Sequence, residues 1–130
     1  MILVDTSVWV AVLRDSSKRR VLEAALQGEV PVFSRFSQLE LLAGCEDERQ
    51  WDLLNRYLAA QDYVDLEAES WPEAARIQSD LRRRSRKTAA VVDCCIAQLA
   101  IDHDLLLLHH DREFEAIAQV RNLRQRRIVL

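Results

Sequence analysis

Apolar residues along this chain alternate between short continuous runs and longer stretches with helical spacing. The short runs predict buried strands, because a strand covered on both faces shows no polar side. We expect five of them, at about residues 2–5, 30–33, 63–66, 105–108 and 127–130. Helical spacing fills the intervals between the strands. This alternation predicts an α/β fold with a largely parallel sheet covered by helices on both faces.

Capping residues set the bounds of the expected helices. Ser16 and Ser17 are expected to cap the second helix, and Pro72 lies in the first turn of the helix after Ser70, where proline is favoured. The most apolar segment, residues 90–102, is expected to be the central buried helix. The other helices are expected at about residues 7–14, 18–27, 35–43, 47–60, 71–84 and 112–118.

Composition predicts a single globular domain, residues 1–130. About half of the residues are hydrophobic, and only two Gly and two Pro are present, which argues against disorder. The three cysteines, Cys45, Cys94 and Cys95, have no Cys-x-x-Cys spacing and are expected to be reduced. No apolar run approaches the roughly 20 residues of a membrane span. We therefore expect a cytoplasmic protein without a membrane segment.

The net charge of −3 argues against a simple electrostatic nucleic-acid binder, but the cations are segregated. One cluster contains Arg82, Arg83, Arg84, Arg86 and Lys87, and the other contains Arg121, Arg124, Arg126 and Arg127. The first cluster is either the solvated end of a helix or a set of phosphate contacts, and the residues leave both open. The second is expected to flank an edge strand and to oppose its aggregation.

Four carboxylates stand where the chain is expected to leave a strand or enter a helix: Asp5, Glu40, Asp93 and Asp111. Asp5 and Asp111 each follow an apolar run, so parallel strands would bring both to the carboxyl edge, where open α/β sheets bind ligands. Asp93 lies among apolar residues, where a partner or a metal would relieve the cost of burial. Converging carboxylates need a divalent cation between them, and hard oxygen ligands select Mg²⁺ or Mn²⁺. Such a site suits metal-assisted phosphodiester hydrolysis.

Each candidate also has a purely structural interpretation. Asp5 and Asp111 could be helix caps, Asp93 could be a first-turn acid that the helix dipole stabilises, and Glu40 could be a solvated side chain. Thr6 and Ser7 add hydroxyls that could orient a carboxylate or a metal-bound water.

The histidines offer a weaker alternative site. His109 is expected to pack inside the sheet and His110 to contact substrate. A zinc site is disfavoured, because the chain has only three histidines and no further soft ligand lies near this pair.

Four segments resemble the acidic motifs of PIN-domain nucleases of the kind found in VapC toxins of bacterial toxin–antitoxin pairs. They are Met1–Trp9, Gln38–Gly44, Val92–Ala97 and Leu107–Glu115. The resemblance covers nearly the whole chain in motif order. It implies a three-layer α/β/α sandwich with strand order 3-2-1-4-5. It also implies that Asp5, Glu40, Asp93 and Asp111 surround Mg²⁺ or Mn²⁺, with Thr6 or Ser7 in support.

The same resemblance implies a metal-dependent endoribonuclease toxin that a small cognate VapB-like antitoxin neutralises. The cluster at residues 82–87 would then contact RNA together with His110. Helices near residues 16–27 and 47–60 could supply a homodimer face. One departure concerns residues 85–92, which contain neither the Gly nor the Pro that related chains often carry before the third acidic motif.

Two other functions fit the residues less well than a nuclease does. Phosphoryl transfer through an aspartyl-phosphate is disfavoured, since Ser7 stands where a haloacid-dehalogenase-like enzyme needs Asp, and no Lys follows Lys87 to serve a receiver domain. A non-catalytic RNA- or protein-binding module with a PIN-like fold is disfavoured because all four acids are present.

Overall fold

The computed structural model describes residues 1–130 and has a five-stranded parallel sheet at its centre, in the order β3-β2-β1-β4-β5. The strands are β1 (Ile2–Val4), β2 (Pro31–Ser34), β3 (Tyr63–Val64), β4 (Leu106–His109) and β5 (Gln125–Arg127). The central strand β1 is wholly buried, as its apolar run predicts. It pairs with β4 so that Val4 lies opposite Leu108. The predicted parallel sheet and strand order are confirmed.

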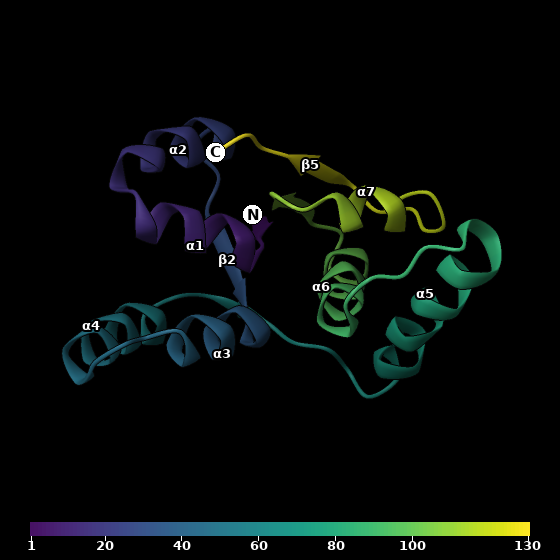
Figure 1. The fold of residues 1–130 in the computed structure, drawn as a ribbon, viewed down its shortest axis with the longest axis horizontal. Helices are drawn as coiled ribbons and strands as arrows, with labels where there is room; N and C mark the ends of the chain where they lie inside the picture. Colours follow the sequence, from purple (N-terminus) through teal and green to yellow (C-terminus); the bar gives the residue numbers. More distant parts are fainter.

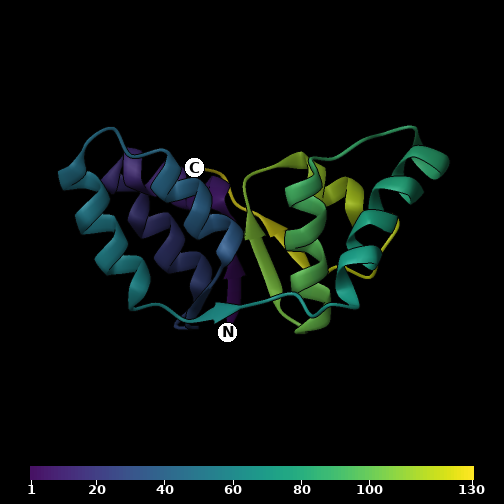
Figure 2. The same cartoon turned by 90° about the horizontal axis from the view of Figure 1, so that it is seen from below.

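Helices cover both faces of the sheet and complete the three predicted layers (Figures 1 and 2). One face carries α1 (Thr6–Arg14), α2 (Arg19–Leu26), α3 (Arg35–Ala43) and α4 (Glu48–Ala59). The other face carries α5 (Ser70–Ser85), α6 (Val91–Asp102) and α7 (Arg112–Ile117). Each layer has its own apolar core, centred on Trp9 and Phe33 in the first and on α6 in the second. None of the helices is both long and apolar enough to span a bilayer.

Side-chain caps begin several of these helices where the sequence predicts. Ser34 accepts a hydrogen bond from the Ser37 N–H at 3.0 Å and starts α3, which ends at Gly44. Asp5 and Asp111 cap α1 and α7 in the same way. The structural interpretation of these two acids is therefore correct, and it leaves a second role open to them.

Three predicted features are wrong in detail. Ser16–Lys18 form a short 3-10 turn capped by Asp15, so Ser16 and Ser17 do not cap α2, which begins at Arg19 without a side-chain cap. The last strand is Gln125–Arg127 rather than 127–130, because pairing with β4 ends where the Ile128 N–H bonds to the His109 carbonyl. Strand β3 covers only Tyr63–Val64 of the predicted 63–66.

The apolar stripe of α4 contributes less to the core than its spacing indicates. Leu58 is fully buried, but Trp51 and Tyr57 remain 41% and 47% exposed. In contrast, α6 buries every residue from Cys94 to Ala100, which confirms it as the central helix of its layer. Cys94 and Cys95 are unpaired thiols within that core.

Candidate metal centre

The carboxyl ends of β1 and β4 lie side by side and carry the first pair of predicted acids. Asp5 directly follows β1, and its backbone N–H bonds to the Leu108 carbonyl of β4 at 2.9 Å. Asp111 follows β4 by two residues. Parallel pairing of neighbouring strands therefore brings both acids to one edge of the sheet, as expected for a site in an open α/β fold.

Ser7 ties these two strand ends together. Its hydroxyl donates to Asp5 Oδ2 at 2.6 Å and accepts a hydrogen bond from the His110 N–H at 3.0 Å. The Ser7 N–H donates to the same Asp5 oxygen at 3.0 Å. Asp5 is only 4% exposed, and burial raises its pKa, although the bonds from Ser7 oppose that shift. Ser7 therefore fixes the Asp5 carboxylate beside the end of β4, and its predicted role as a supporting hydroxyl stays a prediction.

Three carboxylates gather beside this edge: Asp93, Asp111 and Glu113 each offer an oxygen within 4.8 Å of the others. Asp93 lies in the first turn of α6, and Asp111 caps α7 by accepting from the Glu113 N–H at 3.0 Å. The Glu113 carboxylate accepts from the Ala90 N–H at 3.0 Å and so joins the start of α6 to α7. Glu113 was not among the predicted site residues. Its place two residues after a candidate acid, within the fourth motif, was the available signal.

Burial and neighbouring charge perturb this group strongly. Burial raises the pKa of Asp93 to about 9, together with its hydrogen bond to Glu113 and the negative charges of Asp5 and Asp111. The same hydrogen bond lowers the pKa of Glu113. Asp93 is therefore the acid of this group that most favours its protonated form. Asp5, whose charge acts on Asp93, belongs to the same electrostatic group. A cation in this position would replace the proton, which is the behaviour of a metal site.

Glu40 lies outside this tight group and is held by hydroxyls. Thr6 Oγ1 donates to Glu40 Oε1 at 3.1 Å and lies 2.8 Å from Ser37 Oγ, which accepts from Ser34 Oγ at 3.2 Å. Since Thr6 has one proton and gives it to Glu40, the bonds run in one direction from Ser34 to the carboxylate. Ser34, Ser37 and Thr6 are buried, whereas Glu40 is exposed. Thr6 therefore contacts one of the predicted acids through its hydroxyl, and Ser37, which the sequence did not indicate, contacts Thr6 in turn.

His109 supports Asp111 from inside the sheet. It is fully buried, its Nδ1 accepts from the Asp111 N–H at 3.1 Å, and its Nε2 lies 2.6 Å from Gln125 Oε1. An acceptor at Nδ1 places the proton on Nε2, which then donates to Gln125. The Phe114 ring packs against the imidazole with centroids 5.0 Å apart. The predicted packed histidine is confirmed, and both nitrogens are used within the protein.

The predicted RNA contacts are His110 and the basic cluster of residues 82–87. His110 is half-buried, with Nδ1 2.8 Å from the Ile128 carbonyl. Arg82, Arg83 and Arg84 occupy the last turn of α5, and Arg86 ends it in a left-handed conformation. All members of the 82–87 cluster are exposed.

Comparison with known proteins identifies the family. A family model for the PIN domain matches residues 2–120. The chain belongs to the PIN-domain family. Ribonuclease VapC11 of Mycobacterium tuberculosis is 32% identical over 133 residues, covering 95% of this chain and 96% of the relative.

The PIN fold recurs in solved structures similar to this chain. VapBC-1 from nontypeable Haemophilus influenzae aligns with a TM-score of 0.78 at 17% identity, over 98% of both chains. A toxin–antitoxin complex from Klebsiella pneumoniae aligns with a TM-score of 0.62 at 19% identity, over 87% of this chain and 88% of that one. At these identities the likeness establishes the fold alone.

The chemistry open to this PIN domain follows from its oxygen ligands. The cluster consists of carboxylates alone, and carboxylate oxygens suit a hard cation such as Mg²⁺ or Mn²⁺ rather than zinc. Both nitrogens of His109 are engaged elsewhere, which removes it as a ligand. The acidic cluster is therefore a candidate site for a hard divalent cation.

Proposed function

We propose that this PIN domain, residues 1–130, is a metal-dependent endoribonuclease toxin of the VapC type that acts in the cytoplasm. The observation that carries the proposal is the convergence of Asp93, Asp111 and Glu113, which each offer an oxygen within 4.8 Å of the others, close enough to Asp5 for its charge to act on Asp93. The VapC ribonuclease relative supports RNA as the substrate. Nothing in the site itself reads a 2′-hydroxyl, so the choice of RNA over DNA rests on that relationship.

The divalent cation would be held by Asp93, Asp111 and Glu113, with Asp5 at the same edge of the sheet. When bound, Mg²⁺ or Mn²⁺ lowers the pKa of a water and stabilises charge on the leaving oxygen. Asp93 would lose its proton on binding, so metal affinity is expected to rise with pH. Glu40 would then be the remaining acid of the four, placed to orient water or substrate.

Two hydroxyls would keep this site in order. Ser7 holds Asp5 against the end of β4, and Thr6 directs Glu40 through its hydrogen bond. Partners of this kind fix the orientation of the residues that bind a metal.

An antitoxin partner is part of the proposal. The support is that a chain of this fold was solved within a toxin–antitoxin complex. A small VapB-like protein would neutralise the enzyme by covering the acidic site. We further propose a homodimer, with the exposed apolar residues of α4, Trp51 and Tyr57, as candidates for its contact face.

Cleavage of cellular RNA tests the proposal. Purified chain, freed of co-purifying peptide, would be incubated with Mg²⁺ or Mn²⁺ and in parallel with EDTA. We expect cutting that requires the cation and falls at least about 100-fold in Asp93→Asn. Asp52→Asn is the matched control, because Asp52 is exposed on α4, in the opposite layer. RNA binding without cutting by folded wild-type protein, with either cation, would instead support a non-catalytic binding module.

A further inference from the structure

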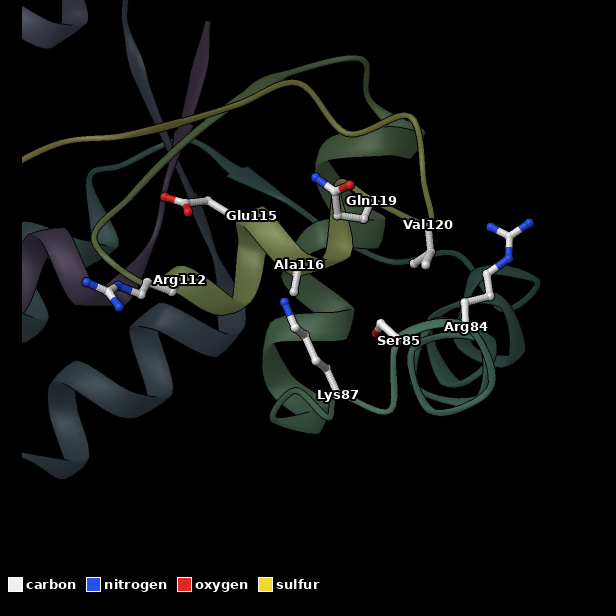
Figure 3. Close-up of a pocket in the computed structure, with 8 residues that line it drawn as sticks. All are labelled: Arg84, Ser85, Lys87, Arg112, Glu115, Ala116, Gln119 and Val120. Carbon is white, nitrogen blue, oxygen red and sulfur yellow. The ribbon is translucent and has the colours of Figure 1, made fainter.

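A hollow of about 710 Å³ lies between the C-terminal end of α5 and the outer face of α7 (Figure 3). One wall is formed by Arg84, Ser85 and Lys87, and the other by residues of α7 and the turn after it, including Arg112, Glu115 and Gln119. Only two of its eight lining residues are hydrophobic, so it is unsuited to an apolar ligand. Its character is set by charge.

Three cations of this hollow have no carboxylate within ion-pair distance: Arg84, Lys87 and Arg112. Glu115, the one acid on the wall, already pairs with Arg127 at 3.7 Å. Cations that no internal carboxylate neutralises are available to an external anion.

Asp80, on the preceding turns of α5, is also committed. It pairs with Arg83 and with Arg121, and these contacts lower its pKa. Arg83, the neighbour of Arg84 in the sequence, therefore has an internal partner, while the three cations on the wall of the hollow have none. Within the basic cluster of residues 82–87, Arg83 is paired with a carboxylate, whereas Arg84 and Lys87, which line the hollow, are not.

The hollow adjoins the acidic cluster. Arg112 stands between Asp111 and Glu113 in the sequence, at the first position of α7. Lys87 lies three residues before Ala90, whose N–H binds the Glu113 carboxylate. In Figure 3, Arg84 and Arg112 lie at opposite ends of the hollow, and Lys87 reaches toward α7 between them. A row of cations that begins beside the acids suits an extended polyanion better than one small anion.

We propose that this hollow binds the phosphate backbone of single-stranded RNA next to the bond that is cut. The inference rests on the proposed ribonuclease function and adds the path of the substrate. Arg112 holds the phosphate nearest the acids, and Lys87 and Arg84 hold those farther along the strand. The negative cluster alone would repel RNA. The cations of the hollow therefore supply binding energy that the catalytic edge lacks.

Binding is measured apart from cutting, in the Asp93→Asn background. Fluorescein-labelled single-stranded RNA of mixed sequence is titrated at several salt concentrations, and anisotropy gives the affinity. We expect Lys87→Ala and Arg112→Ala each to weaken binding several-fold. Each should also reduce the slope of log affinity against log salt by about 0.7, the value for one phosphate contact on a single strand. Arg20→Ala on α2 removes the same charge in the opposite layer and should change neither quantity.

Three outcomes overturn the inference. The first is a Lys87→Ala, Arg112→Ala double variant that binds RNA as Arg20→Ala does. The second is an equal loss in Arg20→Ala, which would mean general charge attraction. The third is poly-glutamate that competes with RNA for the wild type at equal charge concentration, which would mean a site for acidic protein segments. Thermal unfolding of each variant shows whether it is folded.

A parallel measurement separates this inference from the proposed function. Wild-type cleavage of the same RNA with Mg²⁺ or Mn²⁺ tests the nuclease, whatever the hollow does. In the cutting enzyme, Lys87→Ala should raise KM and leave kcat nearly unchanged, because it removes binding that ground state and transition state share. Cleavage by Lys87→Ala with an unchanged KM would contradict RNA binding in the hollow and leave the proposed nuclease function standing.

Discussion

At the scale of single residues, Ser7 and Ser17 take part in the same local hydrogen-bond motif but differ in their contacts with the rest of the fold. Ser7 and Ser17 each donate both N–H and hydroxyl to an aspartate two residues earlier, with hydroxyl distances of 2.6 Å in both cases. Only Ser7 also accepts a hydrogen bond from another strand end, through the His110 N–H. The same short sequence pattern thus has a local role at Asp15 and a long-range one at Asp5.

Ser7→Ala is expected to lower RNA cleavage about 10-fold to 100-fold, the usual cost of removing a partner that orients a metal-site residue. Ser17→Ala is the matched control and should leave cleavage unchanged, because Asp15 and Ser17 are both exposed and the Ser17 hydroxyl bonds only to Asp15. Cleavage rates at saturating Mg²⁺ and thermal unfolding would be measured for both. Equal activity of the two variants would show that Ser7 is merely a capping residue.

His109 offers a second test at this scale, as a positioning residue for Asp111. His109→Leu removes the acceptor of the Asp111 N–H and leaves Gln125 without its partner, so we expect activity to fall about 10-fold or more. His109→Asn places an amide oxygen where Nδ1 stood and should recover most of that loss. The kinetic comparison is made on variants shown to be folded. Asn and Leu variants of equal activity would rule out the positioning role.

At the scale of elements, the packing of α5 on α6 carries much of the second core. Leu81 and Ile77 of α5 are fully buried in the cluster that contains most of α6. Leu81→Ala is expected to reduce the free energy of unfolding by about 2–5 kcal/mol. Leu53→Ala on α4, where the side chain is 57% exposed, should cost less than about 0.5 kcal/mol. Urea unfolding of both variants gives the comparison, and a similar loss in the two would contradict the assigned core.

Elements with strong local signals were predictable from the sequence. Strand β1 is a continuous apolar run, and α3 has a serine cap and a glycine stop, so their bounds follow from local chemistry. The end of β5 was not predictable in the same way. Its pairing partner β4 fixes where the strand ends. The apolar side chain of Ile128, just past the last hydrogen bond of the ladder, is buried although it lies outside the strand.

The site was predictable to a similar extent. Asp5 and Asp111 follow strands and reach the same edge because the topology requires it. Glu113 was missed because its place in the cluster depends on the approach of Ala90 and Asp93, a contact between elements, and its position two residues after Asp111 was the one local signal. Ser37 was missed for a related reason, since its contact with Thr6 joins residues 31 positions apart in the chain.

At the scale of the whole molecule, opposite charges are concentrated next to each other. The acidic cluster lies at the starts of α6 and α7, and unpaired cations line the adjoining hollow. The small net charge of −3 hides this arrangement. Because affinity for RNA depends on local phosphate contacts rather than on total charge, a chain with an excess of acids can still be expected to bind RNA through the cations of the hollow.

The crowding of acids also predicts how stability depends on pH. The pKa of Asp93 is about 9 in the folded protein, far above its ordinary value of 3.8, so its contribution is greatest in acid and is lost as pH rises toward 9. Burial raises the pKa of Asp5, which acts in the same direction. The lowered pKa of Glu113 acts in the opposite direction, but only as pH falls through its own acidic range. Metal-free protein should therefore become less stable between neutral pH and about pH 9.

Asp93→Asn isolates this effect, because its amide resembles the protonated acid and cannot ionise. In EDTA we expect the variant to be more stable than the wild type at alkaline pH, and the difference to shrink toward about pH 3, below the ordinary pKa of 3.8, where Asp93 is protonated in both the folded and the unfolded state. Saturating Mg²⁺ should stabilise the wild type by about 2.7 kcal/mol at 100 times its dissociation constant, and the variant by much less. Urea unfolding across this pH range, with Asp52→Asn beside it, makes the measurement. A wild type and an Asp93→Asn variant with parallel pH profiles would mean that the pKa of Asp93 is not raised in the folded protein.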